Sequence, residues 1–374
     1  MVHDDGVRFG EIRTASGHVF GHARLNAPAS LNALSLAMID SLAPQLQRWA
    51  EDPRVAGVLL DGAGDKAFCA GGDVVALYRA IRAATSGEVP AAAAAFFERE
   101  YRLDFQLHQF PKPVLCWGHG VVMGGGIGLM AGASHRVATP RTRLAMPEIG
   151  IGLFPDVGGS WFLRRMPGRT GLFLALTGAP LNAADARFAG LADAVLPHEQ
   201  QGAVLEAIAQ TAWSGERQAD GARLSHLLQA QAGEVAPPES LLRRHFDLID
   251  EVIGHDALAD IAPRLRALAT HDDPWLANAG KAFAAGSPTS AALSFALWQR
   301  ARHLSLAEVF RLEYQVAVGC CLQHDFAEGV RALLVDKDKT PRWSPATLAE
   351  ITDSHIAEHF RPRFNGPHPL ADLQ

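Results

Sequence analysis

Two glycine clusters are the first features of the sequence that could do chemistry. They cover residues 68–73 (FCAGGD) and 124–128 (GGGIG), and each follows a strand pattern and precedes a helical one. Glycine lets a ligand approach the backbone closely, and a helix N-terminus presents N–H groups that favour negative charge. Two such loops facing one point would form an oxyanion hole. One cluster alone would more simply be a tight turn, but two in tandem favour the functional interpretation.

Two carboxylates form the second candidate feature. Glu148 and Asp156 lie eight residues apart in segment 146–159 (MPEIGIGLFPDVGG), among apolar residues and glycines. In such surroundings a carboxylate is either a salt-bridged structural group or one member of an acid–base pair with shifted pKa values. The composition of the segment favours neither of these two interpretations over the other.

Other kinds of site are less well supported. Residues 126–131 match the dinucleotide-binding pattern GxGxxA, but residues 118–125 separate that pattern from the strand that it should follow directly. Ser160 lacks the second glycine of a nucleophile elbow. The four cysteines contain no CxxC pair, so the sequence predicts neither a disulfide framework nor a zinc site. We therefore expect no metal and no redox cofactor.

An α/β framework must position these residues. Apolar strand patterns occur at 55–60, 113–117 and 136–138, and two further strands are expected within 7–26. Ser35 is a predicted N-cap, followed by apolar residues at helical spacing up to Trp49. Strands that alternate with glycine loops and helices are typical of an α/β fold.

The pattern changes near residue 197. Beyond it the periodicity predicts mainly helices, at 200–213, 241–253, 257–268 and 306–321, with a linker at 233–238. We therefore expect two parts, an α/β core at 1–197 that holds the site and a helical region at 198–374.

The composition narrows the class of partner. With 374 residues, 48% hydrophobic and 20% charged, the chain has the balance of an ordinary globular protein. A formal net charge of −6 argues against nucleic acid or an anionic membrane as partner. The longest stretch without Asp, Glu, Lys or Arg, 113–135, contains seven glycines, so a strand, loop and helix explain it better than a membrane span. The polar N-terminus lacks a signal-peptide pattern, and we expect a cytoplasmic protein.

Taken in order, these segments resemble the crotonase (enoyl-CoA hydratase/isomerase) superfamily. The matching segments are LNAPASLNALS (25–35), FCAGGD (68–73), KPVLCWGHGVVMGGGIGL (112–129) and MPEIGIGLFPDVGG (146–159). Within the superfamily the chain is similar to the 3-hydroxyisobutyryl-CoA hydrolase family. This more specific resemblance rests on FFEREY (96–101), the segment 152–181, SPTS (287–290) and DFAEGVRALLVDKDKTPRW (325–343). Together the matches extend over nearly the whole chain.

The resemblance implies a crotonase-like spiral of ββα units with helices at the C-terminus, and a small-molecule acyl-CoA substrate. It implies an oxyanion hole formed by the backbone N–H groups of Gly72 and Gly125. It implies that Glu148 and Asp156 are the catalytic carboxylates, and that Glu100 is a further acid of the substrate site. No cofactor beyond the CoA of the substrate is implied, and association into a homo-oligomer is left open.

Two departures from the family pattern refine the expectation. The family's hydratases carry a second glutamate in the pattern GGGxE, where this chain has Gly128. We therefore expect hydrolysis of (S)-3-hydroxyisobutyryl-CoA, as in valine breakdown, rather than hydration of an enoyl-CoA. Many members also have a lysine near the CoA phosphates where this chain has Ala29, so Arg24 or Lys337 is the candidate replacement. The alternatives are an enoyl-CoA hydratase or isomerase of the same fold and a non-catalytic acyl-CoA-binding protein.

Overall fold

A computed structural model describes residues 6–232 and 238–374, and the chain forms two compact units that each combine distant segments. The first unit contains the residues up to Gly72 together with Leu103–Leu144 and Leu181–Arg243, and the second contains Asp73–Arg102, Ala145–Pro180 and Arg244–Gln374. The division expected near residue 197 followed a change of sequence pattern and stays a prediction. The expected linker at 233–238 lies, except for Pro238, outside the described residues.

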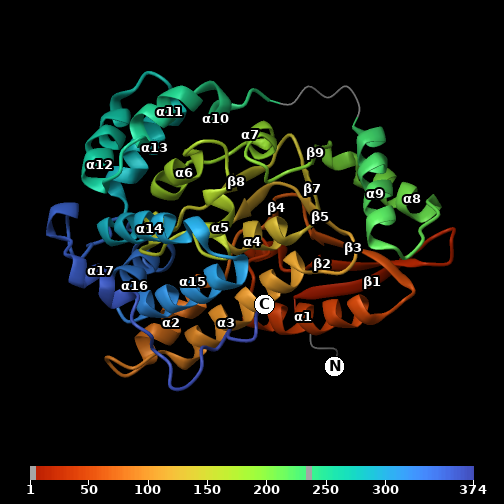
Figure 1. Cartoon of the computed structure of the whole chain (residues 1–374), viewed down its shortest axis with the longest axis horizontal. Helices are drawn as coiled ribbons and strands as arrows, with labels where there is room; N and C mark the ends of the chain where they lie inside the picture. The colour runs from red at the N-terminus through yellow and green to blue at the C-terminus, as the bar shows by residue number, and fades with distance from the viewer. Residues whose placement is uncertain (1–5, 233–237) are drawn as a thin grey trace. The chain divides into compact units, whose positions relative to one another are not determined.

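The described strands form two sheets. The strands are β1 (Val7–Arg13), β2 (Val19–Leu25), β3 (Val55–Gly62), β4 (Ala67–Cys69), β5 (Val114–Gly118), β6 (Val121–Met123), β7 (His135–Ala138), β8 (Arg143–Ala145) and β9 (Ala194–Val195). The larger sheet has the order β1-β2-β3-β5-β7-β9, and the three short strands pair in the order β4-β6-β8. β1 and β2 are antiparallel, whereas the pairs from β2 to β9 in the larger sheet are parallel (Figure 1).

The chain repeats one connection between the sheets. A strand of the larger sheet leads to a strand of the smaller sheet and then to a helical segment, as in β3, β4 and α2 (Val74–Ala83). The same order recurs in β5, β6 and α4 (Gly125–Gly132), and in β7, β8 and the short helix η2 (Glu148–Ile151). This repeat is the predicted spiral of ββα units, so the expected fold class is confirmed. Each glycine or carboxylate motif follows a short strand of this repeat.

Helices form most of the remaining regular structure of the described chain. The remaining α-helices are α1 (Leu36–Glu51), α3 (Ala91–His108), α5 (Gly159–Arg164), α6 (Thr170–Thr177), α7 (Ala183–Phe188), α8 (Gln201–Gln210), α9 (Arg217–Gln231), α10 (Leu241–Arg244), α11 (Phe246–Ile253), α12 (Leu258–Ala267), α13 (Pro274–Ala285), α14 (Pro288–Arg300), α15 (Leu306–Cys321), α16 (His324–Val330) and α17 (Asp353–His359). The helices predicted after residue 197 are therefore confirmed within a few residues. No described helix is both long and apolar enough to cross a membrane.

Local sequence explains the first helix. The Ser35 hydroxyl accepts a hydrogen bond from the Met38 N–H, as an N-cap should. The buried side chains of α1 recur at spacings of three and four, which places one apolar stripe against β1, β2 and β3. The stripe consists of Met38, Ile39, Leu42, Leu46 and Trp49.

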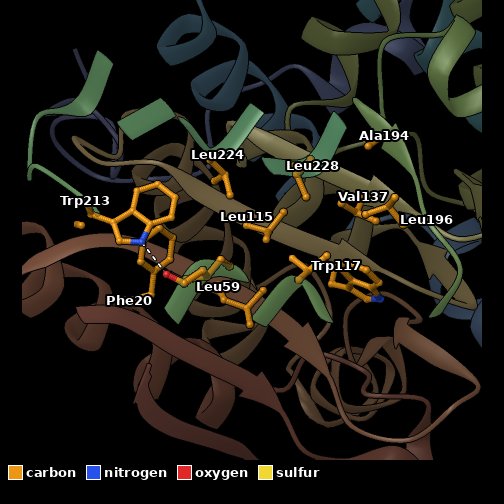
Figure 2. Packing of buried hydrophobic residues seen from close by; sticks show 13 residues of the cluster. Phe20, Leu59, Leu115, Trp117, Val137, Ala194, Leu196, Trp213, Leu224 and Leu228 are labelled. Atoms are coloured by element: carbon orange, nitrogen blue, oxygen red, sulfur yellow. Dashed lines mark hydrogen bonds between the residues drawn. The ribbon is translucent and has the colours of Figure 1, made fainter. Parts of the chain in front are cut away.

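The core of the first unit lies on the larger sheet. Figure 2 shows Leu59, Leu115 and Val137 from successive parallel strands beneath Leu224 and Leu228 of α9. At one end of this cluster the rings of Phe20 and Trp213 lie 4.6 Å apart, and the Trp213 indole donates to the Ile208 carbonyl at 2.8 Å. Burying aliphatic and aromatic area on one face of the larger sheet stabilises β3, β5 and β7, the strands that lead into the short strands before the motifs.

Candidate active site

The two glycine loops come together in the first unit. Gly72 follows β4 and pairs with Leu34 in an isolated parallel bridge, while Gly125 is the first residue of α4. A Cβ placed on Gly71 would lie 3.3 Å from the Met123 carbonyl and 3.8 Å from the Gly125 nitrogen. Gly71 has φ +108° and Gly124 has φ +47°, conformations that favour glycine. The two predicted oxyanion loops are therefore in direct backbone contact.

Glycine is also required just inside α4. A Cβ on Gly126 would lie 2.3 Å from the Cys69 carbonyl oxygen, so a side chain there would separate the loops. The first N–H groups of a helix have no intrahelical partner, and the Gly125 N–H belongs to this set. The arrangement can supply backbone donors to a negatively charged oxygen without using any side chain.

The three predicted acids come together in the second unit. Glu148 begins η2, Asp156 lies in the loop after it, and Glu100 belongs to α3. Their exposed fractions are 5%, 5% and 2%, so all three carboxyls are buried. The negative charge of Asp156 raises the pKa of both glutamates, which places the three groups within electrostatic reach of one another. The structure thus supports the paired-acid interpretation of Glu148 and Asp156 over separate salt bridges.

Burial sets the protonation of this cluster. Burial raises the pKa of Glu148 well above its usual range, and the Asp156 charge raises it further. Burial, followed by the Asp156 and Glu148 charges, does the same to Glu100. Burial raises the pKa of Asp156 only to about 6, because a hydrogen bond from Tyr101 stabilises its anion. Like charges in one desolvated site cannot all ionise, so Asp156 is the carboxyl best prepared to hold the negative charge.

Tyr101 is a functional candidate that the sequence analysis did not single out. Its hydroxyl donates to Asp156 Oδ2 at 2.7 Å, and burial together with the Asp156 charge raises its own pKa well above 10. The phenol therefore stays protonated and remains a donor. It follows Glu100 on α3, so one helix presents two of the cluster's side chains.

Glu313 is the second residue that the sequence analysis missed. It is fully buried on α15, and its two oxygens accept hydrogen bonds from the N–H groups of Gly158 and Ser160 at 2.7 and 2.8 Å. Val157 and Gly158 both have positive φ angles, so this loop turns sharply directly after Asp156. Burial raises the pKa of Glu313 to about 8 despite those hydrogen bonds. Glu313 therefore fixes the loop that carries Asp156.

The candidate cations for the CoA phosphates have different environments. Arg24 donates to the fully buried Asp61 carboxylate at 2.5 and 2.9 Å, so its charge is already compensated. Lys337 is exposed in the second unit. Ala29 lines a cavity of about 360 Å³ in the first unit, and Lys66 lines the same cavity. Lys66 is thus a cation that shares a cavity with Ala29, the position where the family pattern has lysine. In the sequence it lies 37 positions after Ala29.

The described residues show no metal-ligand cluster. Across 6–232 and 238–374, no group of three or more His, Cys, Asp or Glu side chains is arranged to hold a metal ion. Gly128 lies buried within α4, where a side chain that could hold or activate water is lacking. The groups described above that could take part in a reaction are the buried carboxyls of the second unit and the backbone N–H donors of the first.

Comparison with known proteins gives two sets of names. A family model described as enoyl-CoA hydratase/isomerase matches residues 20–360. Proteins named 3-hydroxyisobutyryl-CoA hydrolase, mitochondrial, are similar over most of their length. The one from Danio rerio is 37% identical over 340 residues, covering 91% of this chain and 86% of the relative. The one from Homo sapiens is 36% identical over 341 residues, with the same shares covered.

The solved structures carry different names. One described as a carnitinyl-CoA dehydratase from Mycobacterium thermoresistibile has a TM-score of 0.85 and 38% identity, and the match covers 99% of each chain. One described as an enoyl-CoA hydratase from Rhodobacter sphaeroides has a TM-score of 0.82 and 35% identity, covering 96% of this chain and 97% of that one. Likeness of this degree places the fold firmly, whereas the reaction must be argued from the site.

Proposed function

Because this chain belongs to the enoyl-CoA hydratase/isomerase family, and within it to the 3-hydroxyisobutyryl-CoA hydrolases that match 91% of its length, we propose that it cleaves the thioester of (S)-3-hydroxyisobutyryl-CoA. Water is consumed, the C–S bond breaks, and the products are 3-hydroxyisobutyrate and CoA. This is the thioester hydrolysis of valine breakdown.

The observation that carries the proposal is the set of buried acids in a chain that has Gly128. Hydration of a C=C bond needs a group to deliver a proton to one carbon while activated water attacks its neighbour. The second glutamate that the family's hydratases use for this is replaced by glycine here. Thioester hydrolysis needs a polarised carbonyl and a carboxylate that either attacks it or activates water. Glu148 is our choice for that carboxylate, by either route, and because burial raises its pKa it would have to give up its proton before it acts.

The remaining roles follow from where the charges form. The Gly72 and Gly125 N–H groups would donate to the thioester oxygen, whose negative charge grows in the transition state. Asp156 would orient the substrate hydroxyl or the attacking water, or accept and shuttle the proton of that water, with Tyr101 holding the Asp156 carboxylate. Glu100 would line the acyl end. Lys66 and Lys337 are the candidates for the CoA phosphates.

One assay tests this reaction against its main alternative. Incubation with (S)-3-hydroxyisobutyryl-CoA should release free thiol, while crotonyl-CoA should keep its enoyl absorbance almost unchanged. Rapid loss of the enoyl signal without thiol release would contradict the proposal. No turnover with any short acyl-CoA, together with measurable binding, would instead support a non-catalytic acyl-CoA-binding protein.

A hydratase or dehydratase is the second candidate, because both solved structures described above carry such names at 35–38% identity. For this chain to add or remove water, Asp156 would have to supply the function of the missing glutamate. Because the Tyr101 hydrogen bond favours the charged form of Asp156, its carboxyl is poorly prepared to deliver a proton.

Location and assembly complete the proposal. All four cysteines are buried and none is joined in a disulfide, which is compatible with a reducing compartment. We propose the cytoplasm, and cell fractionation would test this because the named relatives are mitochondrial. Sedimentation of the purified chain would decide whether it associates into a homo-oligomer.

A further inference from the structure

A pocket in the second unit, separate from the carboxyl cluster, has a cationic lining. Its volume is about 310 Å³. Arg164 at the end of α5, Arg169 before α6 and Arg302 in the short helix η5 (Ala301–His303) bring three guanidinium groups to its wall. Phe295 and Trp298 of α14 add aromatic surface. Nothing in the proposed hydrolysis uses these residues.

The three arginines lack the carboxylate partners with which arginines usually form ion pairs. Within residues 6–232 and 238–374, none of them is ion-paired with a carboxylate. Burial, and then the charges of Arg302 and Arg169, lower the pKa of Arg164, so the cations disfavour one another. Asp256 also lines the pocket, but one carboxylate does not offset three guanidinium charges.

The position of Arg164 points to an absent acceptor. Its guanidinium carbon lies 4.5 Å from the centroid of the Trp298 ring, and Trp298 is only 8% exposed. This stacking holds the flat cation against the pocket wall. The Arg164 Nε atom is buried and has no hydrogen-bond acceptor among the described residues. A buried donor without an acceptor is costly, so the described residues do not fully satisfy the Arg164 guanidinium.

Backbone carbonyl groups, rather than a carboxylate side chain, orient the Arg169 guanidinium. Its Nη1 donates long hydrogen bonds to the carbonyls of Ile253 and His255, at 3.3 and 3.4 Å. Carbonyl oxygens hold the guanidinium in place without neutralising its charge. The pocket therefore combines three uncompensated positive charges, two of which are positioned by neighbouring groups.

We propose that this pocket binds an organic phosphate of about nucleotide size. The guanidinium fork matches the geometry of phosphate oxygens better than that of a single-point anion. A volume of about 310 Å³ exceeds what a bare phosphate needs and lies at the lower end of ligand pockets. The partly exposed Phe295 side chain offers a wall for a flat ring beside the Arg164–Trp298 stack. This inference does not depend on the proposed hydrolysis.

The test is titration calorimetry of the full chain with ADP. The unmodified protein should bind ADP, and Arg302→Ala should weaken binding by about tenfold or more, as expected for losing a charge-assisted contact. Arg302 is exposed, so its removal should leave the fold intact. Arg141→Ala, which removes an exposed arginine of the first unit, is the matched control and should leave ADP binding unchanged. ADP should also raise the melting temperature of the unmodified chain but not that of Arg302→Ala.

Two outcomes would overturn the inference. One is the absence of ADP binding by the unmodified protein up to roughly millimolar concentration. The other is equal weakening by Arg302→Ala and Arg141→Ala, which would mean diffuse charge attraction rather than a site. Competition then separates two sources of the phosphate. If free CoA displaces ADP and Arg302→Ala raises KM for CoA thioesters, the pocket holds the phosphate tail of the substrate. If ADP still binds at saturating CoA, the ligand is a separate nucleotide.

Discussion

The glycine loops of the first unit and the carboxyl cluster of the second unit build function in opposite ways. In the proposed mechanism the backbone of Gly72 and Gly125 is the functional group, and what would matter there is the absence of a side chain. In the same proposal the side chains of Glu148 and Asp156 carry the chemistry, and what would matter there is burial and the neighbouring charges. Turnover that depends on the backbone site should fall when a side chain is added there and should not change with pH. Turnover that depends on the carboxyl site should change when one carboxyl is protonated or one hydrogen bond is removed.

The largest effect should come from adding a side chain to the backbone site. Gly125→Val places an isopropyl group at the buried start of α4, where the Gly71 loop lies against it. We expect turnover to fall by at least about a hundredfold, the usual cost of one oxyanion donor, with circular dichroism unchanged. Gly10→Val is the matched control, because that glycine is exposed and a Cβ there meets nothing within 4 Å. Near-normal activity of Gly125→Val would remove Gly125 from the site.

Replacement of the Glu148 carboxyl by an amide should have the next largest effect. Glu148→Gln keeps size and polarity but can neither attack a carbonyl nor accept a proton from water. We expect kcat to fall by roughly three orders of magnitude while KM changes little. Glu251 is an exposed acid of the same unit, and Glu251→Gln should leave kcat and KM unchanged. Equal, small effects of the two variants would mean that Glu148 is structural.

A smaller, pH-dependent effect is expected from the hydroxyl that holds Asp156. Tyr101→Phe removes the hydrogen bond that stabilises the Asp156 anion, so the pKa of Asp156 should rise above about 6. If activity needs the anion, the acidic limb of the kcat profile should move to higher pH, and kcat at neutral pH should fall several-fold. Tyr314→Phe, another buried tyrosine, is the control.

Asp156→Asn separates this positioning role from a structural one. The amide has the same size but cannot take up a proton, so the variant should bind substrate and turn over slowly at every pH. The Tyr101→Phe change should then have little additional effect in an Asp156→Asn background, because both act through one carboxylate. Independent, additive losses would argue against Tyr101 as a positioning residue.

The smallest effect should appear in stability rather than in rate. The pKa of Glu313 is about 8 in the folded chain against an ordinary value of 4.5, so the folded state keeps its proton where the unfolded state has lost it. The free energy of unfolding should therefore fall as pH rises from about 4.5 to 8. Glu313→Gln mimics the protonated acid, so the free energy of unfolding of this variant should fall less steeply with pH. A melting temperature measured as a function of pH would show the shallower slope. An unchanged slope in that variant would contradict the assignment.

The fold was largely predictable because its long elements carry strong local patterns. β3 and β5 are apolar runs, and α1 has both its cap and its stripe in sequence. The strands of the smaller sheet have three residues each, too few to show a periodicity. The combination of chain segments into two units also depends on contacts far apart in sequence, which no local pattern encodes.

The candidate site could be proposed from the sequence only where a motif is local. The glycine loops and Glu148 lie in short, distinctive segments, and the resemblance identified Asp156 and Glu100. Tyr101 meets Asp156 across 55 residues of sequence, and Glu313 meets the following loop across more than 150. Tyr101 ends the segment FFEREY (96–101), but nothing in that segment indicates its hydrogen bond to Asp156, and no local pattern around Glu313 indicates its contact with the loop. What positions the acids is therefore visible only after the chain has folded.

The burial of the four cysteines has a practical meaning for work with this protein. Their exposed fractions range from 0 to 4%, and burial raises the pKa of Cys116, Cys320 and Cys321 above that of an ordinary thiol. A disulfide dye reacts with thiolate, so the folded enzyme should consume almost no dye while released CoA consumes it stoichiometrically. Once the chain unfolds, four additional equivalents should react per molecule. One chromogenic reagent can thus count product and, in a slow second phase, report how many enzyme molecules have lost their fold during the measurement.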